Sequence, residues 1–121
     1  LLEPIRRGSL QLKNRIIMSP LTRCHAMGAD GRTPKALMKE YYVQRATAGL
    51  IISEATSVTP IGVGYEHTPG IWSDDHVKEW QVITDAVHKE GGKRCCGFWQ
   101  TVYCQSRPGA TLRIESGIKC A

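Results

Sequence analysis

The chain contains two short apolar runs, Arg15-Ile16-Ile17-Met18-Ser19 and Leu50-Ile51-Ile52-Ser53. The first run stops at Pro20 and the second stops at Glu54. Uninterrupted apolar runs of this length are typical of strands that are buried on both faces, as in a parallel sheet. We therefore predict two strands, at 15–19 and 50–53, that lie side by side and point in the same direction.

The residues between these two runs predict a helix. Thr33 can cap a helix, and Pro34 suits the first helical position, where its missing N–H costs nothing. The helix is expected to extend from Lys35 to Ala48 and to end at Gly49. Because parallel strands need a long crossover connection, a helix at this place fits the predicted sheet.

The flanking segments add a hairpin, a long loop and a second helix. Residues 1–12 predict a β-hairpin that turns at Arg7-Gly8. Residues 55–72 are rich in Gly, Pro and Thr and predict a long loop. Ser73 is suited to cap a helix that ends at Gly91-Gly92. Its apolar stripe would consist of Val77, Trp80, Ile83 and Val87.

This order of elements predicts an α/β fold with a parallel sheet. A doubly wound sheet needs about five strands, and a (β/α)₈ barrel needs about 250 residues. A chain of 121 residues is therefore expected to hold only part of such a fold. The recognisable part would be the opening quarter of a larger fold.

Composition argues against several classes of partner. The net charge of +5 is concentrated toward the C-terminus, and no dense basic run is interleaved with aromatic residues, so we expect no nucleic-acid partner. No apolar run approaches the roughly 18 residues of a membrane span, and neither end resembles a targeting signal, so we expect a cytoplasmic protein without a membrane partner.

We also expect no metal site. The cysteines lack zinc-binding spacing: Cys24 stands alone before residue 94, and the other four lie in the last 28 residues. The histidines are scattered, and each is predicted to be solvated or to lie on a helix surface; they are His25, His67, His76 and His88. The tyrosines of Glu40-Tyr41-Tyr42 are predicted to fill a core.

The working face of a barrel lies at the C-terminal ends of its strands. Ser19 to Arg23 and Glu54 to Thr56 are the segments at that face. A small residue such as Ala55 permits close approach of a flat ligand, and the Thr22 hydroxyl could donate to a ring carbonyl oxygen. From the residues alone, the alternative that Pro20 only ends a strand and Thr22 only caps a turn stays open.

Five sequence blocks, in this order, resemble the start of the old yellow enzyme family, and in particular its 12-oxophytodienoate reductase-like branch. The blocks are Leu12 to Arg23, Glu40 to Tyr42 with Gln44 to Ala46, Gly49 to Thr56, Gly64-Tyr65 with Thr68 to Trp72, and Asp85 to His88 with Gly91 to Lys93. Members of this family are FMN-containing (β/α)₈ barrels. The resemblance therefore implies an α/β fold in which this chain holds only the N-terminal hairpin and the first two βα units of such a barrel. In them NADPH reduces the flavin, which then reduces the C=C bond of an α,β-unsaturated carbonyl.

The resemblance implies particular roles. Pro20, Leu21 and Thr22 would lie against the flavin ring, with the Thr22 hydroxyl near the C4 oxygen, and Ala55 would contact the flavin. Tyr65 would face the substrate, which would be a small enone or oxylipin, as in jasmonate metabolism. The resemblance implies no catalytic residue within this chain, because the family's carbonyl-binding pair, tyrosine proton donor and phosphate site lie further downstream.

The resemblance covers residues 1–93. Gly97 stands where the family has a flavin-contacting glutamine, and Gln100 does not replace it by direct count. We therefore predict an N-terminal barrel part at 1–93 and a non-family tail at 94–121, from a shifted reading frame or alternative splicing. Such a chain is expected to be inactive alone and aggregation-prone. The alternative is a noncatalytic product that binds intact relatives or has no role.

Overall fold

The computed structural model describes residues 1–8 and 10–95. In chain order the elements are β1 (Ile5–Arg7), β2 (Leu10–Leu12), β3 (Ile17–Met18), α1 (Ala36–Val43), β4 (Leu50–Ile52), the 3₁₀ turn η1 (Pro60–Gly62), α2 (Asp74–Lys89) and β5 (Arg94–Cys95). β1 and β2 pair as an antiparallel hairpin, which confirms the predicted one.

β3, β4 and β5 form a parallel sheet in that order. Ile17 is paired with Leu50 and Met18 with Ile51, which confirms that the two predicted strands lie side by side in one direction. Both strands are shorter than predicted. The third strand starts at Arg94, just past residue 93, where the sequence predicts the family-like part to end. Gly97 and Gln100 lie outside the described residues.

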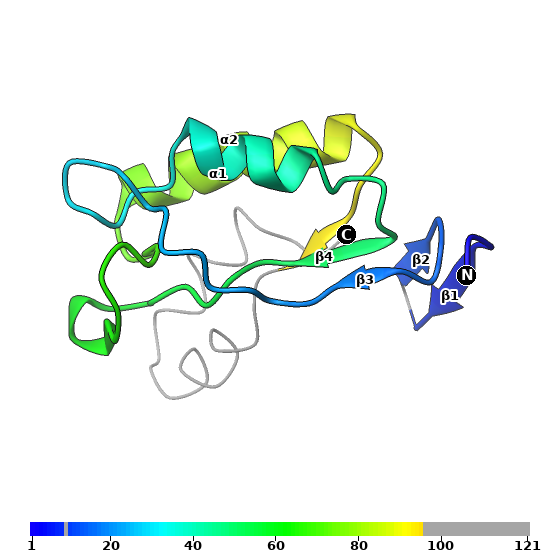
Figure 1. Cartoon of the computed structure of the whole chain (residues 1–121), viewed down its shortest axis with the longest axis horizontal. Coiled ribbons are helices and arrows are strands. Elements are labelled where there is room, and N and C mark those ends of the chain that lie inside the picture. Colours follow the sequence, from blue (N-terminus) through cyan, green and yellow to red (C-terminus); the bar gives the residue numbers. More distant parts are fainter. Residues whose placement is uncertain (9, 96–121) are drawn as a thin grey trace.

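Both helices lie on the same side of the parallel sheet (Figure 1). The core fills the space between these layers. It includes Tyr42 from α1, Ile51 from β4, and Trp80, Ile83 and Val87 from α2, which confirms most of the predicted stripe. The rings of Tyr42 and Trp80 lie 6.1 Å apart between centroids, so Tyr42 fills the core as expected.

The opposite face of the sheet is not covered by any helix or strand among residues 1–8 and 10–95. The side chain of Ile17 is 51% exposed, whereas its neighbour Met18 packs against the core. Successive residues of a strand point to opposite faces, so Ile17 lies on the uncovered face with its partner Leu50. The prediction that the first strand is buried on both faces is therefore wrong for the described residues.

The start and length of the first helix differ from the prediction. Lys35, not Thr33, occupies the N-cap position, with extended backbone and no side-chain cap hydrogen bond. The Thr33 hydroxyl donates instead to Asp30 Oδ2, at 3.0 Å. Because the backbone is still extended at Lys35, the helix starts only at Ala36, and Thr33 lies too early in the chain to cap it. After Val43 the chain continues to Ala48 as turns, with hydrogen bonds between residues three apart.

α2 begins as predicted, with Ser73 at its N-cap. The Ser73 Oγ accepts a hydrogen bond from His76 N at 3.2 Å, and Asp74 and Asp75 lie in the first turn. Both acidic side chains favour this end of the helix, because the helix dipole is positive there. Gly91, with φ of 72°, follows the helix, as the sequence predicted.

Replacing Ser73 by Ala is expected to lower the free energy of unfolding by about 1 kcal/mol, because His76 N loses its side-chain acceptor. Urea unfolding followed by tryptophan fluorescence would measure the loss. Ser73→Thr is the matched control, since threonine keeps the hydroxyl, and should stay within about 0.5 kcal/mol of the parent. Equal losses in both variants would contradict the role of the cap.

Candidate functional site

The two long loops that follow β3 and β4 gather at the C-terminal edge of the sheet, while the hairpin lies at the opposite end (Figure 1). A pocket of about 500 Å³ lies between these loops. Its walls include Thr22 from the segment after β3, Ala55 and Thr56 from the end of β4, and Tyr65 and Thr68 from the long loop. The fold therefore opens a pocket where a parallel α/β fold normally carries its ligand.

The structure brings together three of the five predicted site residues, namely Thr22, Ala55 and Tyr65, around this pocket. Pro20 and Leu21 belong to the same exposed segment as Thr22, but they do not line the pocket. Tyr65 lines the pocket and is 72% exposed, so it lies on an open side of the pocket. Within the part of the chain that the structure describes, the Thr22 hydroxyl makes no hydrogen bond and is free to donate to a ligand.

The long loop is closed upon itself by main-chain hydrogen bonds. Ser57 N donates to Pro69 O at 3.0 Å, and Ile71 N donates to Ser57 O at 2.9 Å, so the two ends of the loop meet. Between them, Thr59 caps η1 through a hydrogen bond from Gly62 N to its Oγ1. The loop therefore has a defined conformation before any ligand binds, although the sequence predicted only an irregular segment.

Arg32 connects this loop to the segment after β3. Its Nη1 donates to Tyr65 O at 2.6 Å, to Thr68 O at 3.2 Å and to Thr68 Oγ1 at 2.9 Å. In return, Gly70 N donates to Arg32 O at 2.9 Å. One guanidinium group thus holds the turn that carries Tyr65, and sequence reasoning gave no sign of this role.

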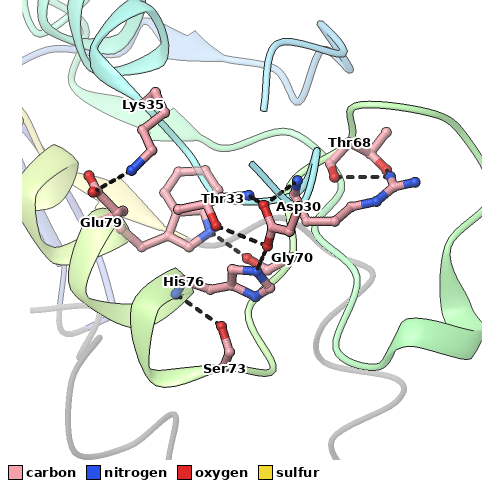
Figure 2. Close-up of polar contacts among 10 residues, drawn as sticks. Asp30, Thr33, Lys35, Thr68, Gly70, Ser73, His76 and Glu79 are labelled. Atoms are coloured by element: carbon pink, nitrogen blue, oxygen red, sulfur yellow. Dashed lines mark hydrogen bonds and ion pairs between the residues drawn. The ribbon is translucent and has the colours of Figure 1, made fainter. Parts of the chain in front are cut away.

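Asp30 and His76 interact and connect the loop before α1 with the first turn of α2 (Figure 2). His76 Nε2 lies 2.7 Å from Asp30 Oδ2, and the carboxylate also accepts from Arg32 N and from Thr33 N and Oγ1. Burial by itself raises the pKa of Asp30, but these hydrogen bonds, that from His76 foremost, outweigh it and hold the pKa well below its ordinary value of 3.8. Asp30 is therefore ionised at neutral pH.

The prediction that every histidine is solvated or on a helix surface is wrong for His76. It is 1% exposed, and its ring meets Trp72 edge-on at 4.7 Å between centroids. Its buried Nδ1 has no hydrogen-bond partner among the described residues. The residue faces inward because Asp30, 46 residues earlier in the chain, supplies a charged acceptor.

Glu54 lies directly before Ala55 and is 1% exposed. Its Oε2 accepts from Arg23 N at 3.1 Å, and its Oε1 accepts from the Tyr42 hydroxyl at 3.3 Å. The Tyr42 oxygen in turn accepts from Glu54 N at 3.1 Å. Burial raises the pKa of the Glu54 carboxyl, and the hydrogen bonds from Arg23 and Tyr42 only partly offset that rise.

Metal-binding clusters and membrane-spanning helices are both absent from the described residues. No group of three or more His, Cys, Asp or Glu side chains among them is placed to hold a metal ion. In the same part of the chain, no helix has the length and apolar character needed to cross a bilayer.

Parallel βα units with a pocket at the strand ends define the class of α/β folds that bind a ligand at the C-terminal face of the sheet. Comparison with known proteins makes the class specific. The chain belongs to the NADH:flavin oxidoreductase / NADH oxidase family, whose model matches residues 1–117. This match continues past residue 93, and the predicted division of the chain there stays a prediction.

Individual relatives agree with the family. The chain is 43% identical over 102 residues to putative 12-oxophytodienoate reductase 5 of Oryza sativa subsp. japonica, covering 82% of this chain and 26% of the relative. It is 39% identical over 121 residues to 12-oxophytodienoate reductase 2 of Arabidopsis thaliana, covering 99% of this chain and 31% of the relative. The chain thus spans about a quarter to a third of these relatives.

A solved structure agrees as well. The old yellow enzyme from Trypanosoma cruzi superimposes with a TM-score of 0.74 at 52% identity, over 79% of this chain and 26% of that one. The two proteins are therefore similar in sequence as well as in fold. The resemblance to the old yellow enzymes and to the 12-oxophytodienoate reductases is therefore confirmed.

Proposed function

We propose that this chain supplies one side of the flavin site of an FMN-dependent ene-reductase, as the opening part of a (β/α)₈ barrel. The observation that carries the proposal is the pocket at the strand ends, which joins Thr22 from the segment after β3 with Ala55 and Tyr65 from the loop after β4. Family membership supports FMN as the cofactor and a reduced nicotinamide dinucleotide as the reductant. We propose NADPH for this reductant. When bound, FMN would supply the hydride that reduces the C=C bond of an α,β-unsaturated carbonyl.

The described residues fit the flat ring of FMN. A flavin ring has broad apolar faces and a polar carbonyl edge. Ala55 presents a small apolar surface at the end of β4, and the Thr22 hydroxyl is free to donate to a ring carbonyl oxygen. Pro20 and Leu21, exposed beside Thr22, would cover the ring from the β3 side. No Lys or Arg is among the described residues that line the pocket, so the phosphate would bind elsewhere.

Tyr65 would contribute to substrate binding. It lines the same pocket, on a loop that Arg32 and Thr68 hold in place through hydrogen bonds to its main-chain oxygen. An exposed aromatic ring can cover a planar enone, while the strand-end residues bind the flavin. The proposed substrate is therefore a small α,β-unsaturated carbonyl compound, such as an oxylipin.

An FMN titration of the 121-residue chain tests the proposal. Binding would quench flavin fluorescence and turn the protein yellow, and NADPH would bleach it if electron transfer occurs. A colourless protein that leaves FMN fluorescence unchanged would contradict flavin binding by this chain. Anaerobic mixing with an enone then separates a reductase from a protein that only binds flavin.

The second candidate is a noncatalytic product that associates with intact relatives. The exposed face of β3, with Ile17 on it, favours this candidate because uncovered apolar sheet surface tends to associate. A colourless chain that co-purifies with a full-length relative would support it. Co-purification should then weaken when Ile17 is replaced by Lys.

Replacing Thr22 by Val is expected to weaken FMN binding about tenfold, because the hydrogen bond from the hydroxyl to the ring is lost at nearly constant volume. The dissociation constant from flavin fluorescence measures the effect. Thr22→Ser keeps the hydroxyl and should bind FMN within about threefold of the parent. If valine binds as tightly as serine, Thr22 does not donate to the flavin.

A further inference from the structure

A buried acid beside the pocket has no part in the function proposed above. Glu54 precedes Ala55, which lines the pocket, but Glu54 itself does not line it. Its carboxylate accepts a hydrogen bond from Arg23 N, and Arg23 directly follows Thr22. One side chain therefore joins the two main-chain segments that form adjacent walls of the pocket.

The carboxylate has little freedom to move. The Tyr42 hydroxyl accepts a hydrogen bond from Glu54 N and donates one to Glu54 Oε1, so it holds the main chain and the side chain of the same residue. Tyr42 is itself buried in the core of α1 and α2. The core thereby fixes the direction of the carboxylate, and the carboxylate fixes Arg23.

A carboxylate at this position is unfavourable for stability alone. Removing a carboxylate from water costs several kcal/mol unless partners compensate, and an apolar residue of similar size would often serve the core better. The Arg23 side chain adds a second restraint on the same segment, because its guanidinium carbon lies 4.6 Å from the centre of the Tyr41 ring. Arg23 is thus held at both its main chain and its side chain, directly after Thr22.

We propose that Glu54 is a positioning residue, whose buried carboxylate holds Arg23 N and thereby fixes the Thr22 hydroxyl relative to Ala55 across the pocket. A hydrogen bond from Thr22 to a ring carbonyl works only within about 0.5 Å of its optimum length. Without the carboxylate, the Arg23 N–H loses its acceptor and the segment after β3 is free to shift. This role rests on the proposed flavin site.

Three variants of the 121-residue chain test the role. Glu54→Ala removes the acceptor. Glu54→Gln keeps an oxygen for Arg23 N and presents an amide that can donate to the Tyr42 oxygen. Ile83→Val is the matched control, because it loosens the core with a small loss of stability and leaves Glu54 in place. Tyr42→Phe releases the carboxylate without removing it, and it carries the test if Glu54→Ala does not fold.

The first readout is amide hydrogen exchange at Arg23, measured by NMR, which needs no cofactor. We expect Glu54→Ala to accelerate this exchange at least about tenfold, beyond any change at the core amides, as expected for loss of a hydrogen bond to a charged group. Glu54→Gln should retain most of the protection, and Tyr42→Phe should lose part of it. Unchanged exchange at Arg23 in Glu54→Ala would overturn the proposal.

The second readout is the absorbance spectrum of FMN added to each variant. A perturbed flavin spectrum in the parent and in Glu54→Gln, reverting toward that of free FMN in Glu54→Ala, supports the positioning role. If Ile83→Val alters the spectrum as much as Glu54→Ala does, the effect is general loosening and the role is rejected. If the parent binds no FMN, the proposed function fails, and the Arg23 exchange alone decides for or against Glu54 as the residue that fixes this segment.

Discussion

Replacing Gly49 by Ala is expected to destabilise the chain by at least about 3 kcal/mol. A Cβ at this position would clash with the main-chain oxygen of Asn14 and would lie 2.9 Å from its Oδ1. Contacts this short with main-chain atoms cannot be relieved by a change of side-chain rotamer. Either the strand that begins at Leu50 or the segment before β3 would have to move.

The position is sensitive because Asn14 and Gly49 connect the two parallel strands at their start. Asn14 Nδ2 donates to Thr47 O at 2.8 Å, and its Oδ1 accepts from Ile16 N at 3.1 Å. Gly49 N donates to Ile16 O at 2.9 Å. Displacing Asn14 would therefore break side-chain and main-chain hydrogen bonds together, and the register of Ile17 with Leu50 depends on them.

Urea unfolding followed by tryptophan fluorescence measures this effect. Gly64→Ala is the matched control, because a Cβ there meets no atom within 4 Å, and its stability should stay within about 0.5 kcal/mol of the parent. If Gly49→Ala is as stable as Gly64→Ala, Asn14 does not lie close enough to Gly49 to exclude a Cβ.

The sequence predicted best where one local signal decides the structure. The apolar run at 50–53, the Ser73 cap and the spacing of Trp80, Ile83 and Val87 each predicted an element that the structure confirms. The family blocks directed attention to Thr22, Ala55 and Tyr65, and these three residues do lie around one pocket. Their roles toward a flavin remain predictions.

The sequence failed where partners distant in the chain decide. Thr33 is a residue type that caps helices, but the backbone stays extended through Lys35, and the Thr33 hydroxyl donates to Asp30 instead. His76 has no ligand-like neighbour in the sequence, and it is buried because Asp30 reaches it from another loop. Glu54 resembles an ordinary end of a strand, and only the fold brings Tyr42 and Arg23 N to its carboxylate. Periodicity and capping rules carry no information on such contacts.

The second large effect is expected at Asp30. Replacing it by Ala removes the acceptor of four hydrogen bonds, from His76 Nε2, Arg32 N, Thr33 N and Thr33 Oγ1. Its side chain is 45% exposed, so each bond contributes toward the lower end of the usual range. We expect a loss of about 3 kcal/mol in the free energy of unfolding.

The loss should reach the pocket wall. Asp30 Oδ1 holds Arg32 N, and the Arg32 guanidinium holds Tyr65 O and Thr68. Without Asp30, the main chain of Arg32 is no longer held in place, and the loop that carries Tyr65 becomes more mobile. Amide exchange at residues 65–68 should therefore accelerate in Asp30→Ala beyond the change seen at core amides such as Ile51, which would distinguish a local release from general destabilisation.

The pH dependence follows from the sign of the shift. The folded-state pKa of Asp30 lies below its ordinary value of 3.8, so its ionised form stabilises the fold above that pH, and the stabilisation is lost as the pH falls further. Asp30→Asn keeps one oxygen for Arg32 N and Thr33 N but cannot ionise, so it should flatten this part of the stability profile. Ser73→Ala is the matched control, because it removes a hydrogen bond but no ionisable group, and it should lower the stability at every pH without changing the slope. If the free energy of unfolding falls equally steeply below pH 4 in the parent and in Asp30→Asn, the ionised form of Asp30 does not stabilise the fold.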